Sequence, residues 1–267
     1  MTEWLASNES SLRLIVFVVV LLALMALEAM LPRRKVAAQR RQRWPANLSI
    51  VVINTVVSRL LLPILPVGAA LLAAERGIGL MPIIDAPFWL SFIACIVLLD
   101  LAIYWQHRLL HALPSLWRIH RMHHADTVFD VTTGARFHPL EIVLSLAFKL
   151  LVVLLLGAPV EAVIAFEIIL NATSMFNHAN LRLPAPVDAC LRCLIVTPDM
   201  HRVHHSTIRQ ETDSNFGFNL PWWDWLFATY RAAPAAGHDN MRIGIEAFRD
   251  SGEQRLDRLL TQPFRRS

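Results

Sequence analysis

Long apolar stretches limit this chain to one broad class of fold. They cover residues 12–31, 47–74, 86–106, 140–156 and 160–177. About 20 apolar residues cross a bilayer as a helix, in which every backbone polar group is paired within the segment. The last two stretches are shorter, but Gly157-Ala158-Pro159 between them predicts a hairpin turn. We therefore expect an all-α fold, a polytopic membrane bundle of about four to five helices.

Two of these stretches contain charged residues. Arg59 interrupts the second stretch together with Pro63 and Pro66. An intramembrane arginine can mark a functional site, but we favour a structural residue in a kink that faces neighbouring helices. Lys149, in the fourth stretch, argues against a span that faces lipid on all sides.

The basic residues predict an orientation. Six of them lie within residues 33–45, namely Arg33, Arg34, Lys35, Arg40, Arg41 and Arg43. The positive-inside rule makes this segment a cytoplasmic loop and puts the N-terminus outside. The first stretch has no basic segment before it and no small-residue cleavage site after it, so we expect a retained helix rather than a signal peptide. Without linkers or low-complexity tracts, residues 1–267 are expected to form one domain.

Composition narrows the choice of partners and compartment. The net charge of +4 is explained by basic residues that flank membrane spans and meet anionic headgroups, so we expect no nucleic-acid partner. The Ala- and Arg-rich composition favours a bacterial inner membrane, with the endoplasmic reticulum as the alternative. Cys190-x-x-Cys193 has the spacing of a redox motif but no strand context, and we interpret both as incidental thiols.

Eight of the eleven histidines fall into three clusters. The first cluster is His107 and His111, the second is His120, His123 and His124, and the third is His201, His204 and His205. Spacings of three and four residues put side chains on one face of a helix, and neutral imidazole is the commonest metal ligand in proteins. The predicted orientation places all three clusters on the cytoplasmic side.

Eight imidazoles exceed what one tetrahedral ion needs, so two metal ions are the simplest explanation. Adjacent histidines point about 100° apart on a helix, so such a pair can serve two metals, or one can ligate while the other contacts a neighbour. His138 and His178 lie at the ends of the predicted hairpin, where both can complete the site. His238 stands alone in a polar segment, and we interpret it as a surface residue.

The donor set favours iron over zinc. A closed zinc site prefers four ligands that include thiolates, and none of the cysteines lies in a histidine cluster. Redox iron with open positions accepts an all-imidazole set, although zinc can replace it in overexpressed protein. Metal-bound histidines usually donate their other N–H to a carboxylate or carbonyl. Asp199 is the first candidate for that role, or alternatively a helix cap, and Asp100, Glu141 and Asp213 are further candidates near the clusters.

These motifs resemble those of the sterol desaturase and fatty acid hydroxylase superfamily over residues 95–231. The resemblance lies in Asp100-x3-Tyr104-Trp105-x-His107-Arg108-x2-His111, Trp117-x2-His120-x2-His123-His124, Phe137-His138-Pro139-x-Glu141, Asn177-His178-x-Asn180, Asp199-Met200-His201-Arg202-x-His204-His205-Ser206, Asp213-x-Asn215-Phe216-Gly217 and Trp223-Asp224-x-Leu226-Phe227-x-Thr229-Tyr230. Some fatty acid hydroxylases carry an extra His-x-x-x-His before the last motif, whereas this chain has only His178 there.

The resemblance implies an integral-membrane, non-heme di-iron oxidoreductase that uses O2 to hydroxylate or desaturate a fatty acyl, sterol, carotenoid or ether lipid. It implies metal ligation by all eight clustered histidines, with His178 and then His138 as further candidates. The sequence has no Gly-rich dinucleotide fingerprint, haem attachment motif or ferredoxin-like cysteine set. Electrons are therefore expected from a separate reductase system such as ferredoxin or cytochrome b5.

Two other functions fit the histidines less well. A zinc-dependent membrane hydrolase would use metal-activated water and would not depend on O2. A metal transporter or sensor would need polar residues along a path across the bilayer, whereas these histidines collect on one side. The hydroxylase interpretation also predicts that the first and third clusters meet in space, with His107 close to His204.

Overall fold

The computed structural model describes residues 2–35 and 37–266, and nearly all regular structure in it is helical. Within these residues, five helical segments are long and apolar enough to cross a membrane: Thr2–Met30, Arg40–Ile83, Phe88–Ala112, Pro139–Leu156 and Val160–Asn177. Their β-pairing is limited to two isolated bridges, Pro32 with Leu181 and Ser206 with Ile243. The predicted all-α membrane fold is confirmed.

The long helices differ in detail from the predicted stretches. Helix α1 covers Thr2–Met30 and so begins ten residues before the predicted start. Helix α2 covers Ala37–Leu61, so most of the basic segment that we expected to be a loop is helical. The second stretch breaks into α2 and α3, Pro66–Arg76, because a proline within a helix removes a backbone donor and clashes with the preceding turn.

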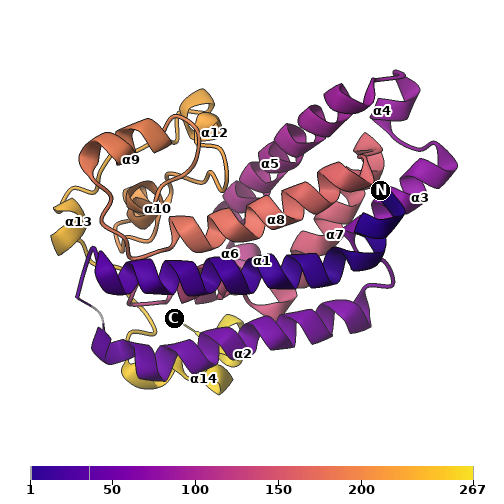
Figure 1. Ribbon diagram of the computed structural model, residues 1–267. Coiled ribbons are helices and arrows are strands. Elements are labelled where there is room, and N and C mark those ends of the chain that lie inside the picture. The colour runs from indigo at the N-terminus through magenta and orange to yellow at the C-terminus, as the bar shows by residue number, and fades with distance from the viewer. Residues whose placement is uncertain (1, 36, 267) are drawn as a thin grey trace.

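The remaining elements follow in chain order. They are α4 Leu80–Ile83, α5 Phe88–Ala112, α6 Pro114–His124, the 3₁₀ helix η1 Val131–Ala135, α7 Pro139–Leu156, α8 Val160–Asn177, α9 Ala185–Leu191, α10 Pro198–His204, α11 Arg209–Thr212, α12 Trp222–Leu226, α13 Gly237–Asn240, η2 Ser251–Gln254, α14 Leu256–Thr261 and η3 Gln262–Phe264. The short helices α9, α10, α12 and α13 gather at one end of the long helices, and α3 and α4 lie at the other (Figure 1).

The long helices pack in pairs around a shared core. Helix α1 lies along α8, and α2 packs against α7. Residues of α3, α5, α7 and α8 form the largest cluster of buried apolar side chains, which includes Cys95, Leu99, Val153 and Phe166. Apolar side chains on the outward faces of the long helices stay exposed, as expected for a surface in contact with lipid.

The predicted hairpin between α7 and α8 is confirmed and packs against the turn before α4. Gly157 ends α7 with a φ of 62°, a left-handed conformation that favours glycine. A Cβ on Gly157 would lie 2.4 Å from the Ile78 carbonyl oxygen, and one on Gly79 would lie 2.1 Å from the Gly157 nitrogen. The two turns therefore touch through their backbones and hold α3 and α4 on this end of the bundle.

Candidate metal centre

The structure gathers nine histidines into two adjacent groups. Group A contains His107, His111, His120, His124 and His204, and group B contains His123, His178, His201 and His205. In each group, one ring nitrogen from every member lies within 4.8 Å of those of all the others. All nine side chains are buried. Each group thus has the number, type and convergence of donors that a transition-metal ion requires.

Helix geometry explains which histidine joins which group. Residues four apart point nearly the same way on a helix, and adjacent residues point about 100° apart. Accordingly, His120 and His124 of α6 both join group A, while His123 between them joins group B. At the third cluster, His201 and His205 join group B and His204 joins group A.

The turn between α5 and α6 brings the first two clusters together. Leu113, which precedes Pro114, has φ −96° and ψ 120°, because a residue before proline is pushed out of the helical region. Helix α5 therefore ends at Ala112, and Pro114 begins α6 at its first turn, where a missing backbone N–H costs nothing. The chain reverses within these few residues and turns the second cluster toward the first.

Hydrogen bonds fix the tautomers of four grouped histidines. The Nδ1 atoms of His107, His123, His178 and His204 lie 2.7–3.2 Å from the backbone carbonyl oxygens of Phe216, Arg136, Ser174 and Ser214. A carbonyl only accepts, so in the neutral ring Nδ1 carries the hydrogen and Nε2 carries a lone pair. These Nε2 lone pairs point into the two groups.

The lone pairs approach one another as closely as the ligand atoms of a shared metal ion do. The Nε2 atoms of His107 and His204 lie 3.1 Å apart in group A, and those of His123 and His178 lie 3.1 Å apart in group B. Neither contact is a hydrogen bond, since neither nitrogen carries a hydrogen. With metal–nitrogen distances of about 2.1 Å, as for zinc, ligand atoms at 90–109° to each other lie about 3.0–3.4 Å apart. The spacing therefore fits ligand atoms that share an ion.

Burial keeps these imidazoles neutral, which is the form that binds metals. Desolvation lowers the pKa of His178 and of His204 to about 3. It also lowers the pKa of His123, His124, His201 and His205 well below the ordinary value, and neighbouring imidazoles add to the effect.

Two carboxylates orient further members of group A. Glu141, in the first turn of α7, accepts a hydrogen bond from Nδ1 of His120 at 2.8 Å. Asp213 lies 3.4 Å from Nδ1 of His111 and also accepts a hydrogen bond from Arg209. Of the carboxylates that the sequence suggested for this role, these two contact grouped histidines directly.

Sequence comparison identifies the family of this chain. A sequence model of the fatty acid hydroxylase family matches residues 92–229, just over half of the chain, and this range contains all nine grouped histidines. The chain belongs to the fatty acid hydroxylase family. The resemblance noted in the sequence is therefore confirmed at the level of the superfamily.

Curated relatives of this hydroxylase-family chain act on different lipids. It is 29% identical to ornithine lipid hydroxylase OlsE of Rhizobium tropici over 181 residues, which cover 67% of this chain and 52% of the relative. It is 30% identical to human alkylglycerol monooxygenase over 137 residues, 50% of this chain and 29% of the relative. It is 27% identical to Delta(7)-sterol-C5(6)-desaturase of Nicotiana tabacum over 154 residues, 54% of this chain and 52% of the relative.

The chain thus spans about half the length, or less, of these curated relatives. No solved structure shows a significant match to it.

Four residues singled out in the sequence, His138, Asp100, Asp199 and His238, neither belong to the two groups nor form hydrogen bonds with their members. His138 caps α7: its Nδ1 accepts from the backbone N–H of Leu140, and its Nε2 lies 3.1 Å from the Leu260 carbonyl oxygen. With both ring nitrogens engaged, His138 has no lone pair free for a metal. The carboxylate of Asp100 accepts hydrogen bonds from the backbone of Asn219 and Leu220 and from the Trp223 indole. Asp100 therefore fastens a loop near the site without touching a grouped histidine.

Asp199 has a different environment from either role that the sequence suggested. Its carboxylate pairs with Arg202, lies 3.6 Å from Arg33 and lies 3.9 Å from Nε2 of His238. The residue that caps α10 is Thr197. The interpretation of His238 as a surface residue is wrong, because its side chain is only 11% exposed beside Asp199.

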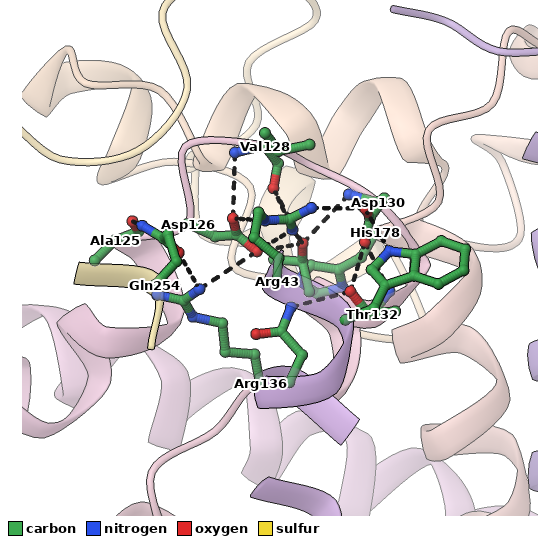
Figure 2. Close-up of polar contacts among 12 residues, drawn as sticks. Arg43, Ala125, Asp126, Val128, Asp130, Thr132, Arg136, His178 and Gln254 are labelled. Carbon is green, nitrogen blue, oxygen red and sulfur yellow. Dashed lines mark hydrogen bonds and ion pairs between the residues drawn. The ribbon is translucent and has the colours of Figure 1, made fainter. Parts of the chain in front are cut away.

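A buried ionic network supports group B, and the sequence did not predict it. Figure 2 shows Arg43 of α2 between Asp126 and Asp130, with Arg136 on the far side of Asp126. All four side chains are buried. Arg43 therefore does not face lipid headgroups as its basic segment suggested. Burial alone would raise the pKa of Asp126. The neighbouring guanidiniums of Arg43 and Arg136 outweigh this effect and lower the pKa of Asp126 below its ordinary value. The network fixes the segment whose Arg136 carbonyl orients His123.

A cavity of about 480 Å³ leads from group A into the helical bundle. His107 and His120 line its inner end together with Glu141 and Phe137. Its walls include residues from α1, α2, α5, α7 and α8, which all belong to the candidate membrane spans. The cavity therefore lies between the histidines of group A and the helices that are apolar enough to cross a membrane.

Proposed function

We propose that this chain is an O2-dependent oxidoreductase that hydroxylates or desaturates a C–H bond of a membrane lipid with two iron ions. The observation that carries the proposal is the position of the histidine groups. Group A, which lies directly beside group B, contributes His107 and His120 to the lining of a cavity whose walls come from membrane-type helices. Membership of the fatty acid hydroxylase family supports the same activity.

The residues of both groups fit a pair of ions. Five imidazoles would hold one ion in group A and four would hold the other in group B. An all-imidazole set without a thiolate suits iron, and zinc is the competitor in overexpressed protein. When bound, the metals supply the O2 chemistry that breaks an unactivated C–H bond. The chain itself holds the imidazoles neutral and oriented, keeps water out and positions the substrate.

The substrate is proposed to be a lipid that enters sideways from the bilayer. Leu14 and Phe17 of α1 and Val51 and Thr55 of α2 line the cavity, and Leu14 and Thr55 are also exposed on the outside of the bundle. This arrangement supports an entrance between α1 and α2. The relatives named above include enzymes of ornithine lipids, alkylglycerols and sterols, which supports a lipid with a polar headgroup.

Hydroxylation inserts one atom of O2 and reduces the other to water, which consumes two electrons and two protons. We propose that a separate reductase system, such as ferredoxin or cytochrome b5, supplies the electrons. The histidine end would face the cytoplasm of a bacterial inner membrane, with the N-terminus outside, and the chain would act as one domain. The basic residues near the histidine end of α2 support this orientation.

The test is a comparison of membrane lipids with and without this protein. Cells that express the chain should contain a lipid whose mass differs by one added oxygen or by the loss of two hydrogens. The His204→Ala variant should not produce it, whereas Arg182→Gln, at an exposed position outside the cavity, should.

The same membranes distinguish the competing functions. If product formation requires O2 and the purified chain contains two metal ions, the proposed hydroxylase or desaturase activity stands. A lipid cleaved with equal efficiency in the absence of O2 would identify a metal-dependent hydrolase instead. Metal movement across the membrane with unchanged lipids would identify a transporter.

A further inference from the structure

Charged side chains line the half of the cavity that lies away from the histidines. Glu167 of α8 accepts hydrogen bonds from Lys149 of α7 and, at 2.7 Å, from Arg13 of α1. Arg13 also lies 3.3 Å from Glu9. Arg59 of α2 lines the same cavity. The metal centre does not use any of these groups.

Helix positions give the depth of this charged end. Glu141, which contacts His120, precedes Lys149 by eight residues of α7, a rise of about 12 Å. On α8, Glu167 precedes His178 by eleven residues, about 16 Å. On α2, Asn54 donates to the carbonyl of Phe137 beside the histidine end, and Arg59 lies about 8 Å farther along the helix.

The charges at this end do not balance. Arg13, Lys149 and Arg59 provide three positive charges, and Glu9 and Glu167 provide two negative charges. Arg13 and Lys149 pair with Glu167, but Arg59 forms no ion pair with any residue that the structure describes. A cation without a counter-ion at membrane depth is costly unless it reaches water or meets an anion. The cavity therefore has an excess of one positive charge, and Arg59, which lines the cavity and is also exposed at the surface of the bundle, is available for a ligand.

Apolar side chains line the cavity between the two ends. Leu14, Phe17, Ile142, Leu146 and Leu170 are among them. The cavity is consequently charged at one end, mainly apolar in between, with Gln106, Ser145 and Asn171 as polar exceptions, and lined by imidazoles at the other end. This pattern matches an amphiphile whose polar group and reacting carbon are held apart by a fixed length of hydrocarbon.

We infer that the substrate is a lipid with an anionic group, a carboxylate or a phosphate, which binds Arg59 beside the Arg13–Glu167–Lys149 cluster. The hydrocarbon chain then extends toward group A, and the carbon that reacts is set by its distance from the anionic group. The oxidation of the substrate in this inference rests on the proposed function, whereas the binding of its anionic group to Arg59 does not. It assigns Arg59 to substrate binding, where the sequence favoured a structural role.

Binding of matched probes tests the inference without turnover. The full chain in nanodiscs of zwitterionic phospholipid is titrated with dodecanoate, dodecyl phosphate and dodecanol. One hydrogen bond to a charged group is worth about tenfold in affinity, so the two anionic probes should bind about tenfold more tightly than the alcohol. A difference between carboxylate and phosphate identifies which anion the site prefers.

Variants at two arginines assign the effect. Arg59→Gln should weaken binding of the anionic probes about tenfold and leave dodecanol unchanged, which also shows that the cavity is intact. Arg59→Lys should restore part of the loss. Arg76→Gln changes an exposed arginine at the end of α3, outside the cavity, and should bind all three probes as the parent chain does. Anionic probes that bind Arg59→Gln as tightly as the parent overturn the inference.

The position of oxidation provides a second readout. With dodecanoate and tetradecanoate as substrates, the oxidised carbon should lie at the same distance from the carboxylate. A position that instead stays constant from the methyl end overturns anchoring by the anionic group. If the Arg59 effect on binding is present but the comparison of membrane lipids shows no oxidised product, the proposed function fails and the anion site stands. If oxidation occurs and Arg59→Gln has no effect, only the anion site fails.

Discussion

His107 and His204 lie with their Nε2 atoms 3.1 Å apart, although 97 residues separate them in the chain. Their Nδ1 atoms donate to the carbonyls of Phe216 and Ser214, two residues of one short loop. That loop is held by Asp224, which accepts hydrogen bonds from the backbone N–H groups of Phe216 and Gly217. A single loop therefore aims histidines of two distant helices at one point.

The two groups predict the metal stoichiometry. The purified full chain should contain two transition-metal ions, because five imidazoles converge in one group and four in the other. His204→Ala should lower the content of group A, and His178→Ala that of group B, each toward one ion. His238→Ala is the control, since His238 belongs to neither group. Elemental analysis after iron-replete expression measures the content, and a parent chain with one ion or none would contradict the two-site model.

Substitution of Glu141 should lower the metal affinity more than substitution of other carboxylates of the helices. Its contact with Nδ1 of His120 holds the imidazole so that Nε2 faces group A. Removing such a partner commonly costs 10–100-fold in metal affinity or activity, so Glu141→Ala should show a loss of about this size. Glu75→Ala, at an exposed position outside the cavity, provides the control. Metal affinity is measured by chelator competition, and equal affinities for the two variants would remove Glu141 from the site.

The buried network of Figure 2 should be essential for stability. Arg43→Met leaves Asp126 and Asp130 buried without their main counter-ion, and breaking a buried ion pair typically costs about 3–5 kcal/mol. Arg41→Met, two residues away and exposed, should be close to neutral. Thermal unfolding in detergent compares the two. Because Arg136 belongs to the network and its carbonyl orients His123, Arg43→Met should also lower the metal content of group B.

The structural features that follow from a periodic pattern of residues could be predicted from the sequence. Apolar stretches long enough for a bilayer predicted the helical fold, and the spacing of four predicted pairs of histidines that share a group. The spacing of three did not, because His120 and His123, like His201 and His204, belong to different groups. The split of adjacent histidines between two groups follows from the same helix geometry. The proximity of His204 and His107 was predicted because eight imidazoles in three clusters indicate a shared metal centre.

Other features depend on the tertiary structure and have no pattern in the sequence. The partners of Nδ1 in four histidines are backbone carbonyls, which every residue has. Arg43 is one of six basic residues in its segment, and only the packing of α2 against the 126–136 segment buries it. His138 stands beside Glu141 in a family-like motif, yet it is used as a helix cap.

The contacts of Asp199 predict a role in the stability of the fold, whereas its position in the sequence suggested a role in orienting a metal-binding histidine. Its carboxylate pairs with Arg202, whose side chain is buried, and not with a grouped histidine. Asp199→Asn should therefore lower the melting temperature, because it leaves the Arg202 charge without its counter-ion, and the metal content should stay at two. Asp188→Asn, which alters a partly exposed pair between Asp188 and Arg192 that contacts no grouped histidine, is the comparison. A loss of metal in Asp199→Asn without loss of stability would restore the original interpretation.

The Lys149–Glu167 pair inside the bundle should show strong coupling between its two residues. Lys149→Met leaves the carboxylate of Glu167 buried with Arg13 as its remaining partner, and such a loss typically costs about 3–5 kcal/mol. Replacing both charges, as in Lys149→Met with Glu167→Leu, removes the uncompensated ion and lets Arg13 pair with Glu9 alone. The double variant should then be more stable than the Lys149→Met single variant. Unfolding of the four proteins in detergent gives the coupling energy, and simple additivity would show that the pair contributes nothing specific to the fold.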